Sequence, residues 1–178
     1  MLLNNSKELL IWTPYKNYST SLHVNFRGPN GWVMVIGANT MMPGLLGPHT
    51  NQFTGPTADR LIRILPVRNP FNRVVSMWKF SQRFCDKENK LSFTNWFNKL
   101  GHKPMNGPVF SQYPHSKIVR CEHIVEDFKA LGIDISNIPW ENKSEDTRPV
   151  ELTKTQKDCI RWFHREDFEA GRYPLEIN

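Results

Sequence analysis

The chain has 178 residues, a hydrophobic fraction of 39% and six tryptophans. This length suits a single domain over residues 1–178, and the apolar content excludes global disorder. The formal net charge of +6 favours an anionic partner, such as a nucleotide, an acidic glycan or a nucleic acid.

The first half of the chain predicts two strands and a long loop. Residues 9–13 form a short apolar run ended by Pro14, which is typical of a buried strand. A polar turn follows, and residues 20–26 are predicted to open a helix. Residues 32–36 predict a second strand between two glycines. The loop at residues 38–56 is long for a compact domain, and such loops are often functional.

The second half alternates strands with helices. Residues 61–67 predict a strand that ends just before Arg68, and Pro70 suits the first turn of a following helix. Further elements are predicted from the spacing of apolar residues: a strand at residues 117–121 and helices at residues 93–100, 124–131 and 154–168. This alternation predicts an α/β fold with a central, mostly parallel sheet flanked by helices. Three tryptophans at helical spacing are assigned to the core, namely Trp78, Trp96 and Trp162.

The turn after the first predicted strand combines one cation with three hydroxyls, Lys16 followed by Ser19, Thr20 and Ser21. In parallel sheets, ligands bind beyond the carboxyl ends of the strands, where helix N-termini offer N–H groups to phosphate. A nucleotide kinase of the P-loop type would place a Gly-rich loop before its lysine, and that pattern is missing. The segment therefore predicts a P-loop-like strand–turn–helix without the kinase signature. An ordinary capped helix with a solvated Lys16 is the alternative interpretation.

The turn after the third predicted strand supplies a second basic group. It reads Arg-Asn-Pro-Phe-Asn-Arg from Arg68 to Arg73, and Ser76 follows Arg68 by eight residues. Together the two turns resemble the sulfotransferases that use 3′-phosphoadenosine 5′-phosphosulfate (PAPS), with the closer match to the carbohydrate (heparan and related Golgi-type) branch. In that family a loop of lysine and hydroxyls holds the 5′-phosphosulfate. An arginine at a strand end and a serine eight residues later hold the 3′-phosphate.

The resemblance implies a site for PAPS and for its desulfated product, PAP. The nucleotide contacts that it implies are Lys16, Tyr18, Ser19, Thr20, Ser21, Arg68, Ser76, Lys143 and Ser144. Tyr18 stands where the family commonly has a small residue. Weaker similarity continues to the C-terminus: residues 120–128 are similar to the family's R-x-E-x-x-x-x-D-[FW], and residues 163–173 to its Y-x-x-D-[FW] helix with a later Tyr.

The resemblance also implies roles in catalysis. Lys16 is assigned to the leaving-group oxygen, and His49 is assigned as general base because the heparan-type branch has its histidine in a similar segment. His115 is the second candidate base, and the remaining histidines, His23, His102, His123 and His164, are assigned to helix faces or the surface. No metal is expected, because a sulfuryl group carries less charge than a phosphoryl group. The expected acceptor is a hydroxyl of a carbohydrate or a small molecule.

Two alternatives stay open at this point, a P-loop-type nucleotide kinase and a non-enzymatic basic binding module. Neither a nucleic-acid partner nor a membrane span is expected. The three cysteines, Cys85, Cys121 and Cys159, have no metal-ligand spacing and an odd count, so reduced thiols are expected. Reduced thiols favour a soluble protein in a cytoplasmic compartment.

Overall fold

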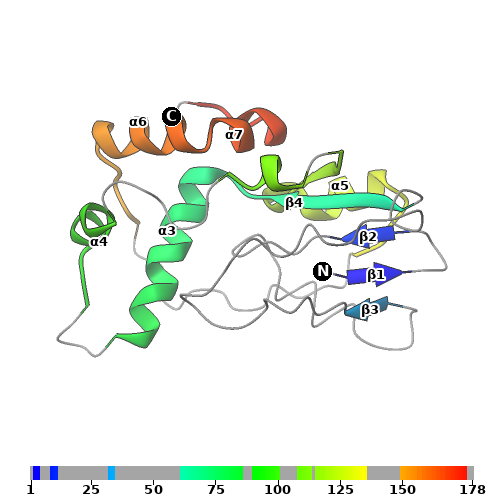
Figure 1. The fold of residues 1–178 in the computed structure, drawn as a ribbon, viewed down its shortest axis with the longest axis horizontal. Helices are drawn as coiled ribbons and strands as arrows, with labels where there is room; N and C mark the ends of the chain where they lie inside the picture. The colour runs from blue at the N-terminus through cyan, green and yellow to red at the C-terminus, as the bar shows by residue number, and fades with distance from the viewer. Residues whose placement is uncertain are drawn as a thin grey trace.

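A computed structural model gives the fold, with elements labelled as in Figure 1. It describes residues 2–4, 9–11, 32–34, 61–85, 90–100, 108–113, 115–135 and 149–175. The described strands form one sheet in the order β3-β1-β2-β4-β5. They are β1 (Leu2–Asn4), β2 (Leu9–Ile11), β3 (Trp32–Met34), β4 (Ile62–Val67) and β5 (Lys117–Arg120).

Parallel pairing confirms the centre of the predicted sheet. Strand β4 lies between β2 and β5 and runs parallel to both, with Ile64 opposite Ile11 on one side and opposite Lys117 on the other. The other side of the sheet differs, because β1 was not predicted and pairs antiparallel with both β2 and β3. Only residues 5–8 separate β1 from β2. So short a connection allows an antiparallel neighbour but not a parallel crossover.

Helices follow β4 and β5, as predicted, whereas the helix predicted at residues 20–26 lies outside the described residues. Helix α3 (Pro70–Ser81) leaves the carboxyl end of β4, and α5 (Ile124–Ala130) follows β5 after a 3-10 turn at Cys121–His123. Asn69 caps α3, since its Oδ1 accepts a hydrogen bond from the N–H of Phe71 at 3.0 Å. Pro70 occupies the first turn, where its missing N–H costs nothing. Helix α4 (Phe93–Lys99) confirms the helix predicted between β4 and β5.

The last predicted helix is wrong in one respect, because it is two helices. They are α6 (Lys154–Phe163) and α7 (Arg165–Gly171), and the chain leaves helical geometry at His164, with φ −112° and ψ 25°. Thr153 opens α6 with a reciprocal capping box to Gln156. Figure 1 shows α6 and α7 one after the other along the top of the view, and α6 contacts α3 while α7 contacts β4.

Apolar side chains cover both faces of the parallel strands. Ile11, Ile64 and Val119 pack on one face against Phe128 of α5. On the opposite face lie Leu10, Leu65, Val67, Val109 and Tyr113. Because both faces are buried, the strands read in sequence as continuous apolar runs rather than alternating ones. A third cluster joins α3, α4, α6 and α7, and in it the ring centroids of Phe71 and Phe168 are 4.9 Å apart.

The prediction of three core tryptophans is confirmed for two. Trp78 and Trp96 are buried between α3 and α4, whereas Trp162 of α6 is 80% exposed. The buried face of α6 centres on Gln156 and Ile160, and Trp162 is two residues beyond Ile160, which turns it to the opposite side. Within the described residues, no helix is long and apolar enough to cross a membrane.

Candidate functional site

The candidate site is the edge of the sheet where β2, β4 and β5 end. Parallel strands bring their carboxyl ends to the same edge of the sheet. Arg68 follows β4 directly, and Cys121 and Glu122 follow β5. The segment with Lys16 begins just after β2 in the sequence, although Lys16 itself lies outside the described residues.

Arg68 is a half-buried cation at this edge. Among the described residues, no hydrogen bond or ion pair joins its guanidinium to a carboxylate. Burial raises the pKa of the Cys121 thiol and lowers that of Arg73, and the charge of Arg68 makes a smaller contribution that lowers both. A half-buried arginine without a carboxylate partner suits an external anion, which a guanidinium can bind through two parallel hydrogen bonds.

Ser76 lies on α3, two helical turns beyond the cap. It is half-buried and lies on the same side of the helix as Asn72, four residues earlier, away from the buried Val74 and Met77. Asn72 is exposed and donates a weak hydrogen bond to Glu122 at 3.4 Å. The polar side of α3 therefore runs from the carboxyl edge of the sheet toward Ser76.

The other predicted site residues lie outside the described residues. These are Lys16, Tyr18, Ser19, Thr20, Ser21, His49, Lys143 and Ser144. Their predicted roles stay predictions. Of the predicted set, the structure describes Arg68 and Ser76.

His115 does not belong to the carboxyl edge. It lies two residues before β5 begins, in a left-handed backbone conformation with φ 63°. The register of β4 and β5 sets it level with Ile62, and Arg68 is six residues farther along. At about 3.3 Å per residue this is a separation of about 20 Å. His115 therefore lies near the amino end of β5, away from Arg68, and its role as the second candidate base stays a prediction.

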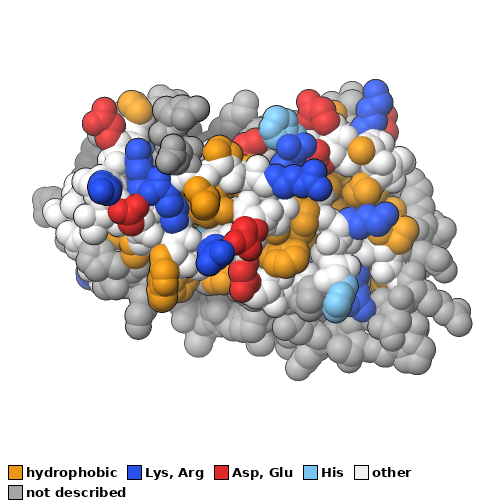
Figure 2. Space-filling model, turned by 90° about the horizontal axis from the view of Figure 1, so that it is seen from above, with side chains coloured by type: hydrophobic (Ala, Val, Ile, Leu, Met, Phe, Trp, Pro, Cys, Tyr) orange, Lys and Arg blue, Asp and Glu red, His pale blue; other side chains and the backbone are white. Residues whose placement is uncertain are grey.

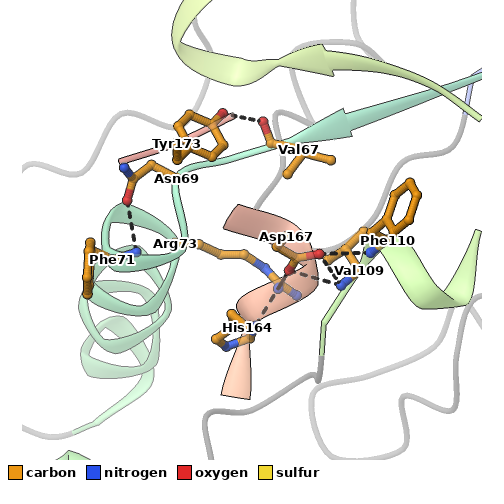
Figure 3. Close-up of polar contacts among 9 residues, drawn as sticks. All are labelled: Val67, Asn69, Phe71, Arg73, Val109, Phe110, His164, Asp167 and Tyr173. Atoms are coloured by element: carbon orange, nitrogen blue, oxygen red, sulfur yellow. Dashed lines mark hydrogen bonds and ion pairs between the residues drawn. The ribbon is translucent and has the colours of Figure 1, made fainter. Parts of the chain in front are cut away.

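A buried ion pair lies behind the edge, between Arg73 of α3 and Asp167 of α7. Their side chains are 2% and 1% exposed, and Nη1 of Arg73 is 3.4 Å from Oδ2 of Asp167. Asp167 also accepts hydrogen bonds from the backbone N–H groups of Val109 and Phe110, at 2.7 and 2.8 Å (Figure 3). One carboxylate thus joins α7, α3 and the start of the 3-10 helix Phe110–Gln112.

His164 completes this cluster and corrects its predicted place on a helix face or the surface. It is fully buried between α6 and α7, and within the part of the chain that the structure describes neither ring nitrogen has a hydrogen-bond partner. Its Nδ1 is 3.5 Å from Oδ2 of Asp167, too far for a good hydrogen bond. Burial therefore lowers the pKa of His164, and the nearby Arg73 acts in the same direction, while Asp167 opposes it.

Because the pKa of His164 is lowered by folding, we expect stability to fall at acid pH. The unfolded chain takes up this proton below its ordinary pKa of about 6.5, and the folded chain does so only at lower pH. The stabilisation is therefore complete above about pH 6.5 and is lost as the pH falls below it. In urea unfolding, His164→Leu should show a smaller decrease between pH 7.5 and 5.5 than the parent chain does. An equal decrease in both would contradict this assignment.

Glu122 and Tyr173 form a second polar group at the edge itself. The N–H of Asn69 donates to Oε1 of Glu122 at 3.1 Å, and the hydroxyl of Tyr173 lies 2.6 Å from Oε2. The same hydroxyl lies 2.8 Å from the carbonyl oxygen of Val67. Burial and Glu122 raise the pKa of Tyr173, so its hydroxyl keeps its proton and donates it.

Arg120 and Asp127 fix the end of β5 next to Glu122. Nε and Nη2 of Arg120 donate to the carboxylate of Asp127 at 2.9 and 2.7 Å, and the N–H of Arg120 donates to it at 2.7 Å. These hydrogen bonds lower the pKa of Asp127 and raise that of Arg120. The strand end and the first turn of α5 are thereby joined at the place where the chain passes to Glu122.

The segments that contain these residues were noted in the sequence, but the contacts that the residues make were not predicted. Arg73, Arg120, Glu122, Asp127, Asp167 and Tyr173 all fall in segments noted for resemblance, and the structure makes them cross-links between elements. A signal was present for His164, since it follows Ile160 by four residues and precedes Phe168 by four. On the single helix that the sequence predicts over residues 154–168, this spacing puts all three residues on one side, and both apolar neighbours are buried.

No protein-family model, curated protein or solved structure matches this chain. Among the described residues, no group of three or more His, Cys, Asp and Glu could hold a metal ion. The described edge offers the guanidinium of Arg68, which no described carboxylate pairs, and the hydroxyl of Ser76 lies on the polar side of α3.

Proposed function

We propose that this protein is a sulfotransferase that moves the sulfuryl group of PAPS to a hydroxyl acceptor. The observation that supports the proposal is the position of Arg68, a half-buried cation at the carboxyl end of β4. The neighbouring parallel strand, β2, leads in sequence to Lys16 and its three hydroxyls. Two anion-binding segments at adjacent strand ends suit a nucleotide with phosphates at its two ends.

In this proposal Arg68 binds the 3′-phosphate of the nucleotide. A phosphate monoester carries nearly two negative charges and three acceptor oxygens, and a planar guanidinium binds it better than a lysine does. Ser76 contributes a hydroxyl from the polar side of α3. Lys143 and Ser144 would cover the same phosphate, as the resemblance implies.

Lys16 and His49 act at the other end of the nucleotide. The acceptor oxygen forms a bond to sulfur while the bond from sulfur to the bridging phosphate oxygen breaks, and PAP leaves. Lys16 neutralises the charge that develops on the bridging oxygen, and His49 takes the proton of the acceptor hydroxyl. Positioning and charge stabilisation supply most of the acceleration in related phosphoryl transfers, and we infer the same here. The proposed acceptor class is carbohydrate.

The described surface does not favour a basic binding module. On the face formed by α6 and α7, basic side chains alternate with acidic ones (Figure 2). Arg161 is paired with Asp158 at 2.6 Å and Arg165 with Glu169 at 2.7 Å. Nucleic-acid binding relies on clustered lysines and arginines, whereas the arginines of this face are interspersed with carboxylates.

Calorimetric titration tests the proposed nucleotide and its site together. We expect PAP to bind the parent chain, and ATP with Mg²⁺ to bind weakly or not at all. Arg68→Ala should lower the affinity for PAP about 10- to 100-fold, as for the loss of one charged hydrogen-bonding partner.

The matched control for this titration is Arg83→Ala. Arg83 is exposed beyond the far end of α3, so the same loss of charge should leave PAP binding nearly unchanged. Preference for ATP with Mg²⁺ over PAP would support the kinase alternative. Equal PAP affinities of Arg68→Ala and the parent chain would remove Arg68 from the site.

A further inference from the structure

Two side chains from distant elements hold the backbone on either side of Arg68. Tyr173, which follows α7, approaches the carbonyl oxygen of Val67 with its hydroxyl at 2.8 Å (Figure 3). Glu122, which follows β5, accepts a hydrogen bond from the N–H of Asn69, with 3.1 Å between that nitrogen and Oε1. The single proton of the Tyr173 hydroxyl is shared between the carbonyl oxygen of Val67 and Oε2 of Glu122, which lies 2.6 Å from the hydroxyl.

These contacts act on the two peptide groups that flank Arg68. The carbonyl of Val67 belongs to the planar peptide before Arg68, and the N–H of Asn69 belongs to the planar peptide after it. The angles φ and ψ of Arg68 are the rotations between those two planes. Holding both planes therefore fixes the backbone of Arg68 and the direction in which its side chain leaves the chain.

Both holding residues are themselves supported by the core. The ring of Tyr173 packs against two of the apolar clusters, and it lies over Gly171, where the Cβ of any other residue would overlap the ring. Asp167, two residues after the start of α7, anchors that helix through the buried Arg73. Glu122 is supported by the Arg120–Asp127 pair at the end of β5.

We infer that Glu122 and Tyr173 are positioning residues that aim Arg68 at the 3′-phosphate of the nucleotide. The inference rests on the proposed function, because it assigns their effect to PAP binding through Arg68. The backbone conformation of Arg68 is set before the ligand arrives, so only its side chain remains to be ordered on binding. Their contribution is to nucleotide affinity and not to the transfer step itself.

Tyr173→Phe tests the inference because it removes one hydroxyl and keeps the ring that fills the core. We expect the affinity for PAP to fall about 3- to 10-fold, the range for one hydrogen bond. In a transfer assay, KM for PAPS should rise while kcat stays nearly constant, since binding is lost equally in the ground and transition states. All titrations are made at a temperature at which thermal unfolding curves show the variants to be folded.

A double-mutant cycle separates positioning from general weakening of the fold. If Tyr173 acts through Arg68, its replacement should matter much less in an Arg68→Lys background, where the guanidinium is already gone. Glu122→Ala should lower PAP affinity and Glu122→Gln, which keeps an acceptor oxygen for Asn69, should restore most of it. Glu126→Ala removes a nearby exposed carboxylate and is the control for charge.

The outcomes distinguish this inference from the function on which it rests. A parent chain that binds no PAP overturns the proposed function, and this inference with it. A parent chain that binds PAP, alongside a Tyr173→Phe variant of equal affinity, overturns the inference alone. The inference is also overturned if Tyr173→Phe lowers PAP affinity by the same factor in the parent chain and in the Arg68→Lys variant. The effect of Tyr173 would then not pass through Arg68.

Discussion

Asp167→Ala is expected to lower the free energy of unfolding by about 3–5 kcal/mol, which is the cost of leaving one member of a buried ion pair alone. The substitution leaves Arg73, 2% exposed, without its carboxylate. It also removes the acceptor of two backbone N–H groups, those of Val109 and Phe110. Urea unfolding at pH 7.5, followed by tryptophan fluorescence, measures the change.

Glu166→Ala is the matched control, because Glu166 precedes Asp167 in the same first turn of α7 and is exposed. Its replacement should change stability by about 0.5 kcal/mol or less. Asp167→Asn keeps one oxygen for the backbone N–H groups but not the charge, so its cost should lie between the two. Similar urea midpoints for all three variants would show that this cluster does not hold the helices together.

His49→Ala is expected to reduce sulfuryl transfer about 100- to 10,000-fold, the usual contribution of a general base. PAP should still bind with nearly the parent affinity, since the base contacts the acceptor and not the nucleotide. Transfer from labelled PAPS to a panel of carbohydrate hydroxyls measures the first quantity, and calorimetry with PAP measures the second.

His115→Ala is the control for this experiment, because His115 lies near the amino end of β5 and Arg68 follows the carboxyl end of β4. Its replacement should leave turnover close to that of the parent chain. Near-normal turnover of His49→Ala would exclude His49 as the base. Loss of turnover in His115→Ala instead would contradict the position of the site at the carboxyl edge.

The turn from β4 to α3 was predictable because its determinants are local. The apolar run, Asn69 as cap and Pro70 in the first turn lie within a few residues of one another, and each favours the same structure. Strand β1 was not predictable in this way. It has three residues, and its pairing with β2 and β3 depends on partners elsewhere in the chain.

The contacts that join elements behind the site could also not be predicted from the sequence. Arg73 and Asp167 are 94 residues apart, and nothing local to either one indicates the other as its partner. The position of Trp162 shows the same limit, since helical spacing gives the relative orientation of side chains but not which side faces the core. The placement of Arg68 was predictable, whereas the two residues that hold its backbone became visible in the fold.

A crystal structure of the chain with PAP tests most directly whether Arg68 and Lys16 bind the two ends of one nucleotide. We expect the 3′-phosphate oxygens to lie about 2.7–2.9 Å from the guanidinium nitrogens of Arg68, and the 5′-phosphate to lie beside Lys16. PAP bound elsewhere on the chain, with neither side chain in contact with a phosphate, would contradict the proposed site and the sulfotransferase function together.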